Sequence, residues 1–147
     1  MSRVFAVLFL MLVLVGCNFK VEREADLRFF RIKTNEQILQ FRSYSIDEQY
    51  RLMRVGNENV HPPQIHLINE FAKNGEPAVA LLVARLKISD EDLEVRDIIA
   101  VLDEMNNSRV YIASSHPALM SLARERVGAM KGIWKPSVEK VLKGIGG

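Results

Sequence analysis

Apolar residues recur at intervals of three and four positions along most of the chain, the spacing that places them on one face of an α-helix. The clearest case is the segment from Val95 to Met105, which follows an i, i+3, i+4, i+7, i+10 pattern through Ile98, Ile99 and Leu102. No Asn-Gly or Asp-Gly pair lies between two runs of alternating apolar and polar residues, the pattern of a β-hairpin. The sequence therefore predicts an all-α protein of about six or seven short helices. The predicted helices cover residues 34–42, 45–55, 61–74, 76–86, 89–105, 115–130 and 135–145.

The predicted helices begin at recognisable start signals. Thr34 with Gln37, and Ser45 with Glu48, have the spacing of a capping box, in which two side chains satisfy unpaired amides at a helix start. Proline, whose missing N–H costs nothing in the first turn of a helix, marks the other starts. These prolines are Pro62, Pro63, Pro77, Pro117 and Pro136. For the helix at Pro117, we predict Ser115 as the N-cap.

Three further segments carry structural predictions. Gly56 is expected to end the second helix, since glycine favours the position after a helix C-terminus. The run from Ala78 to Ala84 is apolar on every face, which predicts a central helix buried between its neighbours. The apolar residues from Val110 to Ile112 interrupt a polar loop and are expected to lie against the core.

The segment from Pro77 to Met105 has the features of a helical hairpin. An apolar first helix is followed by an acidic turn with Asp92 and then by the pair Val95-Arg96. These features resemble a HEAT-type repeat, although Ile99 stands where such a repeat usually has a small residue. About three such units are needed to form a core, and three helix pairs fit in this chain. The sequence thus predicts stacked antiparallel pairs (HEAT-like) or, alternatively, an irregular helical bundle.

The N-terminus has a different pattern from the rest of the chain. Arg3 precedes twelve consecutive apolar residues, a run too short for a membrane-spanning helix but typical of a signal peptide. The sequence Leu-Val-Gly-Cys at residues 14–17 then resembles the lipobox of bacterial lipoproteins. That resemblance implies cleavage between Gly16 and Cys17, a diacylglycerol on the Cys17 thiol and an acylated new amino group. The alternatives are an ordinary secretory signal and an uncleaved anchor helix.

The lipoprotein resemblance sets the expected organisation and location. Residues 1–16 are the signal peptide, residues 17–33 a lipidated tether and residues 34–147 the helical domain. Several acyl chains anchor a protein stably to a membrane, so no cofactor other than the covalent lipid is expected. In a Gram-negative bacterium, Asn18 rather than Asp after the cysteine implies the outer membrane, facing the periplasm. In a Gram-positive bacterium, the outer face of the cell membrane is implied.

Composition and charge narrow the functional classes. Cleavage leaves 131 residues and lowers the formal charge from +2 to +1, too little basic excess for a nucleic-acid binder. The lone cysteine excludes an internal disulfide and a cysteine-rich zinc site. The charge is nevertheless segregated, since residues 88–107 carry seven acids against one arginine and residues 117–147 carry six bases against two acids. We interpret this as neighbouring helices with complementary solvated faces, or as a basic surface for an anionic partner.

The sequence contains no catalytic or metal-binding motif. His61 and His66 lie on different faces of a helix, and the pair His66 and Glu70 is too small a ligand set for a metal. Ser115 and His116 lack the glycine-flanked nucleophile turn of a hydrolase. The acidic run beginning at Asp90 lacks the glycine of a calcium loop, and no glycine-rich phosphate loop is present. We therefore predict that the protein is not an enzyme and holds no metal.

Three aromatic residues are candidates for partner binding. Phe29 and Phe30 lie beside the tether and are expected to be exposed, whereas Trp134 is either a binding anchor or the lid of the core. The leading functional hypothesis is a lipid-anchored adaptor that binds another envelope protein. The alternatives are a protective or inhibitory lipoprotein of the immunity type and, less favoured, a cell-wall-acting enzyme that uses His66 and Glu70.

Overall fold

The computed structural model describes residues 24–146, which form helices and connecting turns with no β-strand among them. The predicted all-α class is therefore confirmed for this part of the chain. The described residues belong to two compact units, one ending at Gln37 and the other beginning at Ile38. The first unit contains a helical segment at residues 24–29 and the start of α2 (Thr34–Arg42). Within residues 24–146, no helix is both long enough and apolar enough to cross a bilayer.

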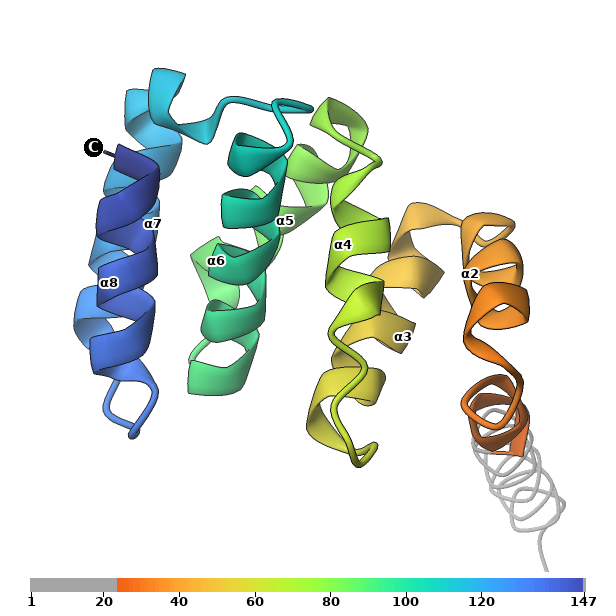
Figure 1. The fold of residues 1–147 in the computed structure, drawn as a ribbon. Helices are drawn as coiled ribbons and strands as arrows, with labels where there is room; N and C mark the ends of the chain where they lie inside the picture. Colours follow the sequence, from red (N-terminus) through yellow and green to blue (C-terminus); the bar gives the residue numbers. More distant parts are fainter. Residues whose placement is uncertain (1–23, 147) are drawn as a thin grey trace, which may run out of the picture. The chain divides into compact units, whose positions relative to one another are not determined.

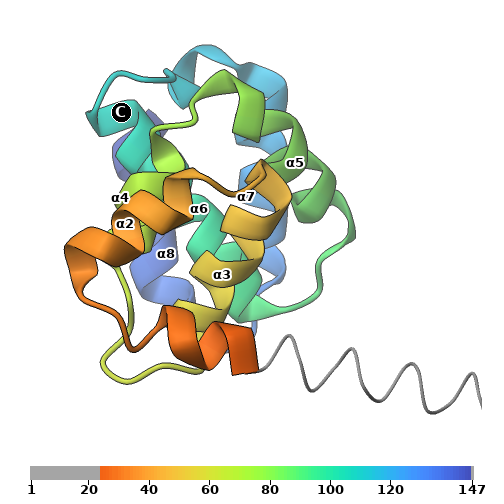
Figure 2. The same ribbon diagram turned by 90° about the vertical axis from the view of Figure 1, so that its right-hand side faces the viewer.

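The second unit is built from successive helix pairs arranged in two layers (Figure 1). One layer contains α3 (Ile46–Glu58), α5 (Glu76–Ile88) and α7 (Pro117–Ala129), and the other contains α4 (His66–Ala72), α6 (Asp92–Asn107) and α8 (Lys135–Gly146). The view in Figure 2 separates α5 and α7 on one side from α4 and α8 on the other. Within each pair the helices run antiparallel, so the unit has the stacked-pair architecture that was one of the two predicted.

Helix starts agree well with their sequence signals. The side chain of Ser45 accepts a hydrogen bond from the Glu48 amide at 3.3 Å, as the predicted N-cap of α3 requires. Pro77 and Pro117 occupy the first turns of α5 and α7. The predicted N-cap at Ser115 is wrong, because its hydroxyl donates to the Ile112 carbonyl at 2.8 Å within the short helix η1 (Ala113–Ser115).

Two predicted helix boundaries need correction. Helix α3 does not end at Gly56, which is buried inside it, and the Asn59 amide still donates to the Val55 carbonyl at 2.9 Å. A glycine favours a helix end only where the backbone needs to turn, whereas Gly56 lies where α3 packs closely against its surroundings. Helix α4 begins only at His66, after the prolines at residues 62 and 63, and is shorter than predicted.

The core of the second unit centres on α6 rather than on α5. Helix α6 contacts α3, α4, α5, α7, α8 and η1. In α5 the fully buried residues are Ala78, Leu82 and Leu86, which form a single stripe, while Ala80 and Ala84 are exposed. The prediction of a centrally buried α5 is therefore wrong. Among the large apolar residues with no exposed surface in the unit are Phe41, Met53, Leu67, Phe71, Leu82, Leu86, Ile98, Leu102 and Met105.

The loop between α6 and η1 is also more exposed than predicted. The side chains of Val110 and Ile112 are 45% and 41% exposed, and the residue that enters the core is Ala113. The amides of Val110 and Tyr111 both donate to the Met105 carbonyl, at 3.1 and 3.3 Å. These bonds attach the backbone of the loop to the C-terminal end of α6. The side chains of Val110 and Ile112 are not needed for this attachment and are partly exposed to solvent.

Candidate functional site

A shallow apolar groove lies between α6 and α8, with Trp134 at one end. It has a volume of about 200 Å³. Its walls are formed by Arg96, Ile99, Ala100, Trp134, Ser137, Val138 and Val141. Trp134 is 42% exposed, so part of its ring lines the groove and part of it faces solvent. A groove of this size accommodates one apolar side chain of a partner.

The indole of Trp134 is supported by a chain of charged contacts. The guanidinium of Arg96 lies over the ring, 5.0 Å from its centroid, in a cation–π contact. The same guanidinium donates through Nε and Nη2 to Asp97 Oδ1 at 2.9 and 2.7 Å. Burial raises the pKa of Asp97, and the charge of Arg96 only partly opposes that rise. The result is a tryptophan whose orientation is set before any partner arrives.

A second polar cluster lies inside the unit and links α3, α5 and α6. The Glu94 carboxylate is 2% exposed and accepts from the Tyr50 hydroxyl at 2.7 Å and from Arg85 Nε at 2.7 Å. Its Oε1 is also 2.9 Å from Nη1 of Arg54. The guanidinium of Arg54 pairs in addition with Glu58 of its own helix and with Glu91, 2.9 Å away. One buried carboxylate on α6 therefore holds donors from two other helices, α3 and α5.

The protonation states of this cluster follow from its contacts. Burial by itself raises the pKa of Glu94, but hydrogen bonds from Arg85, Ser89 and Tyr50 and the charge of Arg54 lower it to about 2. Burial and the adjacent Glu94 raise the pKa of Tyr50. Glu94 is thus ionised and Tyr50 protonated at neutral pH. Neither group is suited to exchange a proton there, so the arrangement is a structural ion-pair network rather than an acid–base pair.

The other predicted binding residues lie in the first unit. Phe29 is 3% exposed, so its expected exposure is wrong, while Phe30 is partly exposed. Their rings meet edge to face, with centroids 5.0 Å apart, and the Phe29 carbonyl accepts from Gln37 Nε2 at 3.2 Å. This local packing uses Phe29 to stabilise the unit and leaves Phe30 as the more accessible ring.

The histidine–carboxylate pair considered for catalysis has other partners. The Glu70 carboxylate pairs with Arg42 at 2.8 Å and with Lys73 at 2.5 Å. These two cations lower the pKa of Glu70 against the effect of burial, which raises it. Burial lowers the pKa of His66, opposed by the Glu70 charge. A carboxylate held by two cations is a poor general base, since its affinity for a proton is reduced.

The remaining predicted residues are not brought together in a site. The His116 ring stacks on Tyr111, with centroids 4.7 Å apart, and the Ser115 hydroxyl is bonded to the backbone. Of the acidic run, Asp92 accepts the amides of Lys131 and Gly132 and Glu94 belongs to the ion-pair network. No cluster of three potential metal ligands occurs within residues 24–146. Gly16 and Cys17, predicted as the cleavage and lipid-attachment residues, lie outside the described part of the chain.

Sequence reasoning identified Trp134 but missed the residues that position it. The sequence indicates Arg96 as half of the Val95-Arg96 pair and as the one base of an acidic segment, and Asp97 as part of the charge of that segment, but links neither residue to Trp134. The sequence does contain a signal for this arrangement. Trp134 directly precedes the apolar helix α8, and the helix that packs against it, α6, carries the adjacent residues Arg96 and Asp97. No protein-family model matches the chain, and no curated protein or solved structure shows significant similarity to it.

Proposed function

We propose that this protein is a lipid-anchored adaptor of the bacterial cell envelope without catalytic activity, which binds another envelope protein through the groove between α6 and α8. The observation that carries the proposal is the half-exposed Trp134 at the end of an apolar groove. Tryptophan and arginine are the residues that most often dominate the binding energy of protein interfaces, and here the two are in contact. The lipobox-like sequence ending in Cys17 supports the anchor.

The groove is suited to a partner because it is ordered in advance. Arg96 is held by the buried Asp97 and in turn orients the indole of Trp134. A partner then loses less conformational freedom at the interface than it would if these side chains had to be fixed on binding. Stacked helix pairs also present an extended row of helix faces, the kind of surface that repeat proteins use for binding.

The groove is tested by filling it. Ala100→Phe places a large ring inside the hollow, and Ala84→Phe makes the same change on an exposed position of α5 in the opposite layer. Both variants are expressed in cells, crosslinked and purified from the envelope fraction. We expect one or more proteins that copurify with the unmodified chain to be lost from Ala100→Phe and retained by Ala84→Phe. Equal recovery from the two variants would contradict a binding role for the groove.

The anchor is tested separately at Cys17. Replacement by alanine removes the thiol that would carry the diacylglycerol, so Cys17→Ala should lose incorporation of labelled fatty acid. The control is the unmodified chain, expressed and labelled in the same way. Incorporation that persists in Cys17→Ala would show that the lipid is attached elsewhere, and no incorporation in the unmodified chain would leave an ordinary secretory signal as the explanation of the leader.

A further inference from the structure

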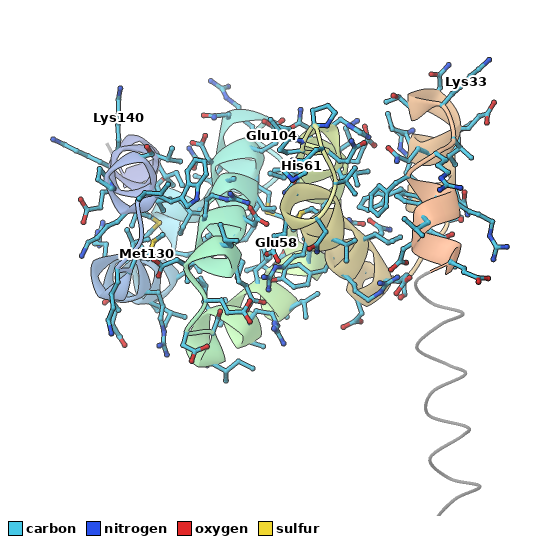
Figure 3. The ribbon with its side chains drawn as sticks, turned by 90° about the horizontal axis from the view of Figure 1, so that it is seen from below. Lys33, Glu58, His61, Glu104, Met130 and Lys140 are labelled. Atoms are coloured by element: carbon cyan, nitrogen blue, oxygen red, sulfur yellow. The ribbon has the colours of Figure 1, made fainter. Side chains whose placement is uncertain are left out.

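Three turns of the second unit lie at one edge, where α3, α5 and α7 end and α4, α6 and α8 begin (Figure 1). Figure 3 looks onto the unit from this side, with His61 and Met130 marking the turns before α4 and α8. We refer to these turns, residues 59–65, 88–92 and 130–134, as the turn edge. The turn edge adjoins the groove between α6 and α8, because Trp134 lies in the last of these turns and also lines the groove.

Each of the three turns exposes a large aliphatic side chain. Ile65 at the start of α4 is 62% exposed, Ile88 at the end of α5 is 71% exposed and Ile133 is 88% exposed. Trp134 directly follows Ile133 and is itself 42% exposed. The turn edge therefore presents one exposed aliphatic side chain on each of its three turns, with Trp134 beside Ile133.

Two lysines flank the Ile133-Trp134 pair, and the turn before α6 carries three acids. Lys131 is exposed, whereas Lys135 Nζ donates to the Gly128 carbonyl at 2.6 Å and lies 4.0 Å from Glu139. Of the acids in the turn before α6, Glu91 pairs with Arg54 and Asp92 accepts the two turn amides. Asp90 is exposed in the same turn and opposes an anionic partner. An isoleucine and a tryptophan between lysines have the composition of a membrane-interface anchor.

The turn that carries Ile133 is held in a fixed conformation. The Asp92 carboxylate accepts the Lys131 amide at 3.0 Å and also the Gly132 amide. The Met130 side chain that precedes them is 3% exposed and packs into the unit. Ile133 and Trp134 therefore project from a turn whose backbone is held by hydrogen bonds. Their insertion into a lipid interface does not require this turn to change conformation.

We propose that the turn edge rests on an anionic lipid surface, with Ile133 inserted among the headgroups and Trp134 at their level. Projecting single side chains of this kind enter a lipid interface one at a time, whereas a protein partner would need a continuous complementary surface. This inference relies on the lipid anchor of the proposed function to bring the turn edge to the membrane. Trp134 belongs both to the turn edge and to the groove, so a lipid surface and a protein bound in the groove would compete for this side chain.

The single tryptophan of the chain makes the proposal directly measurable. The chain purified from bacterial membranes is reconstituted into vesicles of phosphatidylcholine alone or of phosphatidylcholine mixed with phosphatidylglycerol. Trp134 fluorescence is then quenched either with lipids brominated near the headgroup or with aqueous acrylamide. We expect brominated lipid to quench Trp134 strongly in the mixed vesicles and weakly in the neutral ones, with acrylamide showing the reverse order.

Three substitutions sharpen the expectation. Lys131→Gln should weaken the contact with mixed vesicles about fivefold, and Asp90→Asn should strengthen it by a similar factor, because one charge near an anionic surface contributes about that much. Ile133→Ser should weaken the contact about tenfold through the loss of an inserted aliphatic side chain. Ile112→Ser is the matched control, since Ile112 is 41% exposed in a turn at the opposite edge, and it should have no effect.

Two outcomes would overturn the proposal. The first is equal quenching of Trp134 by acrylamide in the neutral and the mixed vesicles while the chain stays bound to both. That result would be consistent with the lipid anchor but would contradict contact between the turn edge and the lipid. The other is loss of a crosslinked protein from Ile133→Ser without any change in lipid quenching, which would assign the turn edge to a protein partner. A chain that does not stay on any vesicle would instead contradict the lipid anchor of the proposed function.

Discussion

Glu94 illustrates how much a single side chain organises in this protein. It is an acid in the first turn of α6, yet its carboxylate is 2% exposed and receives donors from Tyr50, Arg85 and Arg54. The sequence does not reveal this arrangement, because all three donors come from other helices. Pairing of this kind depends on the way helices stack, and local sequence spacing carries no information about it.

Removing the charge of Glu94 should destabilise the fold. Glu94→Gln preserves the size of the side chain but leaves Arg54, whose side chain is 13% exposed, without one of its carboxylates. Loss of one partner of a buried ion pair lowers the free energy of unfolding by about 3 kcal/mol at the lower end of the usual range. We expect this lower value because Arg54 still pairs with Glu58 and Glu91 in the variant. Urea unfolding measures the difference.

The matched control for that measurement is Glu139→Gln. Glu139 is 53% exposed and lies 4.0 Å from Lys135, so its replacement should change the free energy of unfolding by less than about 0.5 kcal/mol. Equal effects of the two substitutions would mean that the Glu94 pairs do not persist in solution.

The same carboxylate gives the stability a defined pH dependence. The pKa of Glu94 is lowered from 4.5 to about 2 in the folded protein, so the unfolded chain binds more protons between these values. The stability from Glu94 is therefore complete above pH 4.5 and is lost as the pH falls toward 2. Unfolding free energies measured across this window should fall more steeply for the unmodified chain than for Glu94→Gln. A shallower slope should remain in the variant, because the pKa of Glu70 is also lowered.

At the scale of the helices, most starts were predictable and several ends and faces were not. Capping side chains and first-turn prolines act locally, which is why the starts of α3, α5, α7 and α8 follow from the sequence. The predicted capping box at Thr34 does not form, because Gln37 Nε2 donates to the Phe29 carbonyl at 3.2 Å. The exposed side of α5 could not be predicted, because a run that is apolar on every face does not reveal which face packs against other helices. The groove itself was out of reach for the same reason, although its most prominent residue, Trp134, was identified by type.

Two glycines should respond to alanine with opposite signs. Gly75 has φ of +60°, and an added Cβ would lie 2.8 Å from the Val110 side chain, so Gly75→Ala should destabilise the fold by about 1–3 kcal/mol. Gly144 lies inside α8 with open space around its Cα, so Gly144→Ala should stabilise it by about 0.5–1 kcal/mol. Thermal unfolding of both variants checks the pair, and a shift in the same direction for both would contradict these backbone assignments.

At the scale of the whole second unit, the stacking of helix pairs predicts a gradient of local stability. Helix α6 has neighbours in both layers, and many of its side chains are fully buried, among them Ile98, Val101 and Leu102. Amide hydrogen exchange followed by mass spectrometry should therefore be slowest in α6 and faster in α5, whose outer face is exposed. Exchange in α5 as slow as in α6 would indicate that another surface covers α5 in solution.

The contact between Asp92 and the turn at Lys131 and Gly132 has a consequence for sequence change over evolution. A Cβ at residue 132 would lie 2.7 Å from Asp92 Oδ2, so any side chain at 132 would displace the carboxylate that accepts the turn amides. We therefore expect positions 92 and 132 to vary together in homologous sequences, with larger residues at 132 appearing only where the side chain at 92 is shorter. Such paired change would maintain the turn that displays Ile133 even where few other residues are preserved.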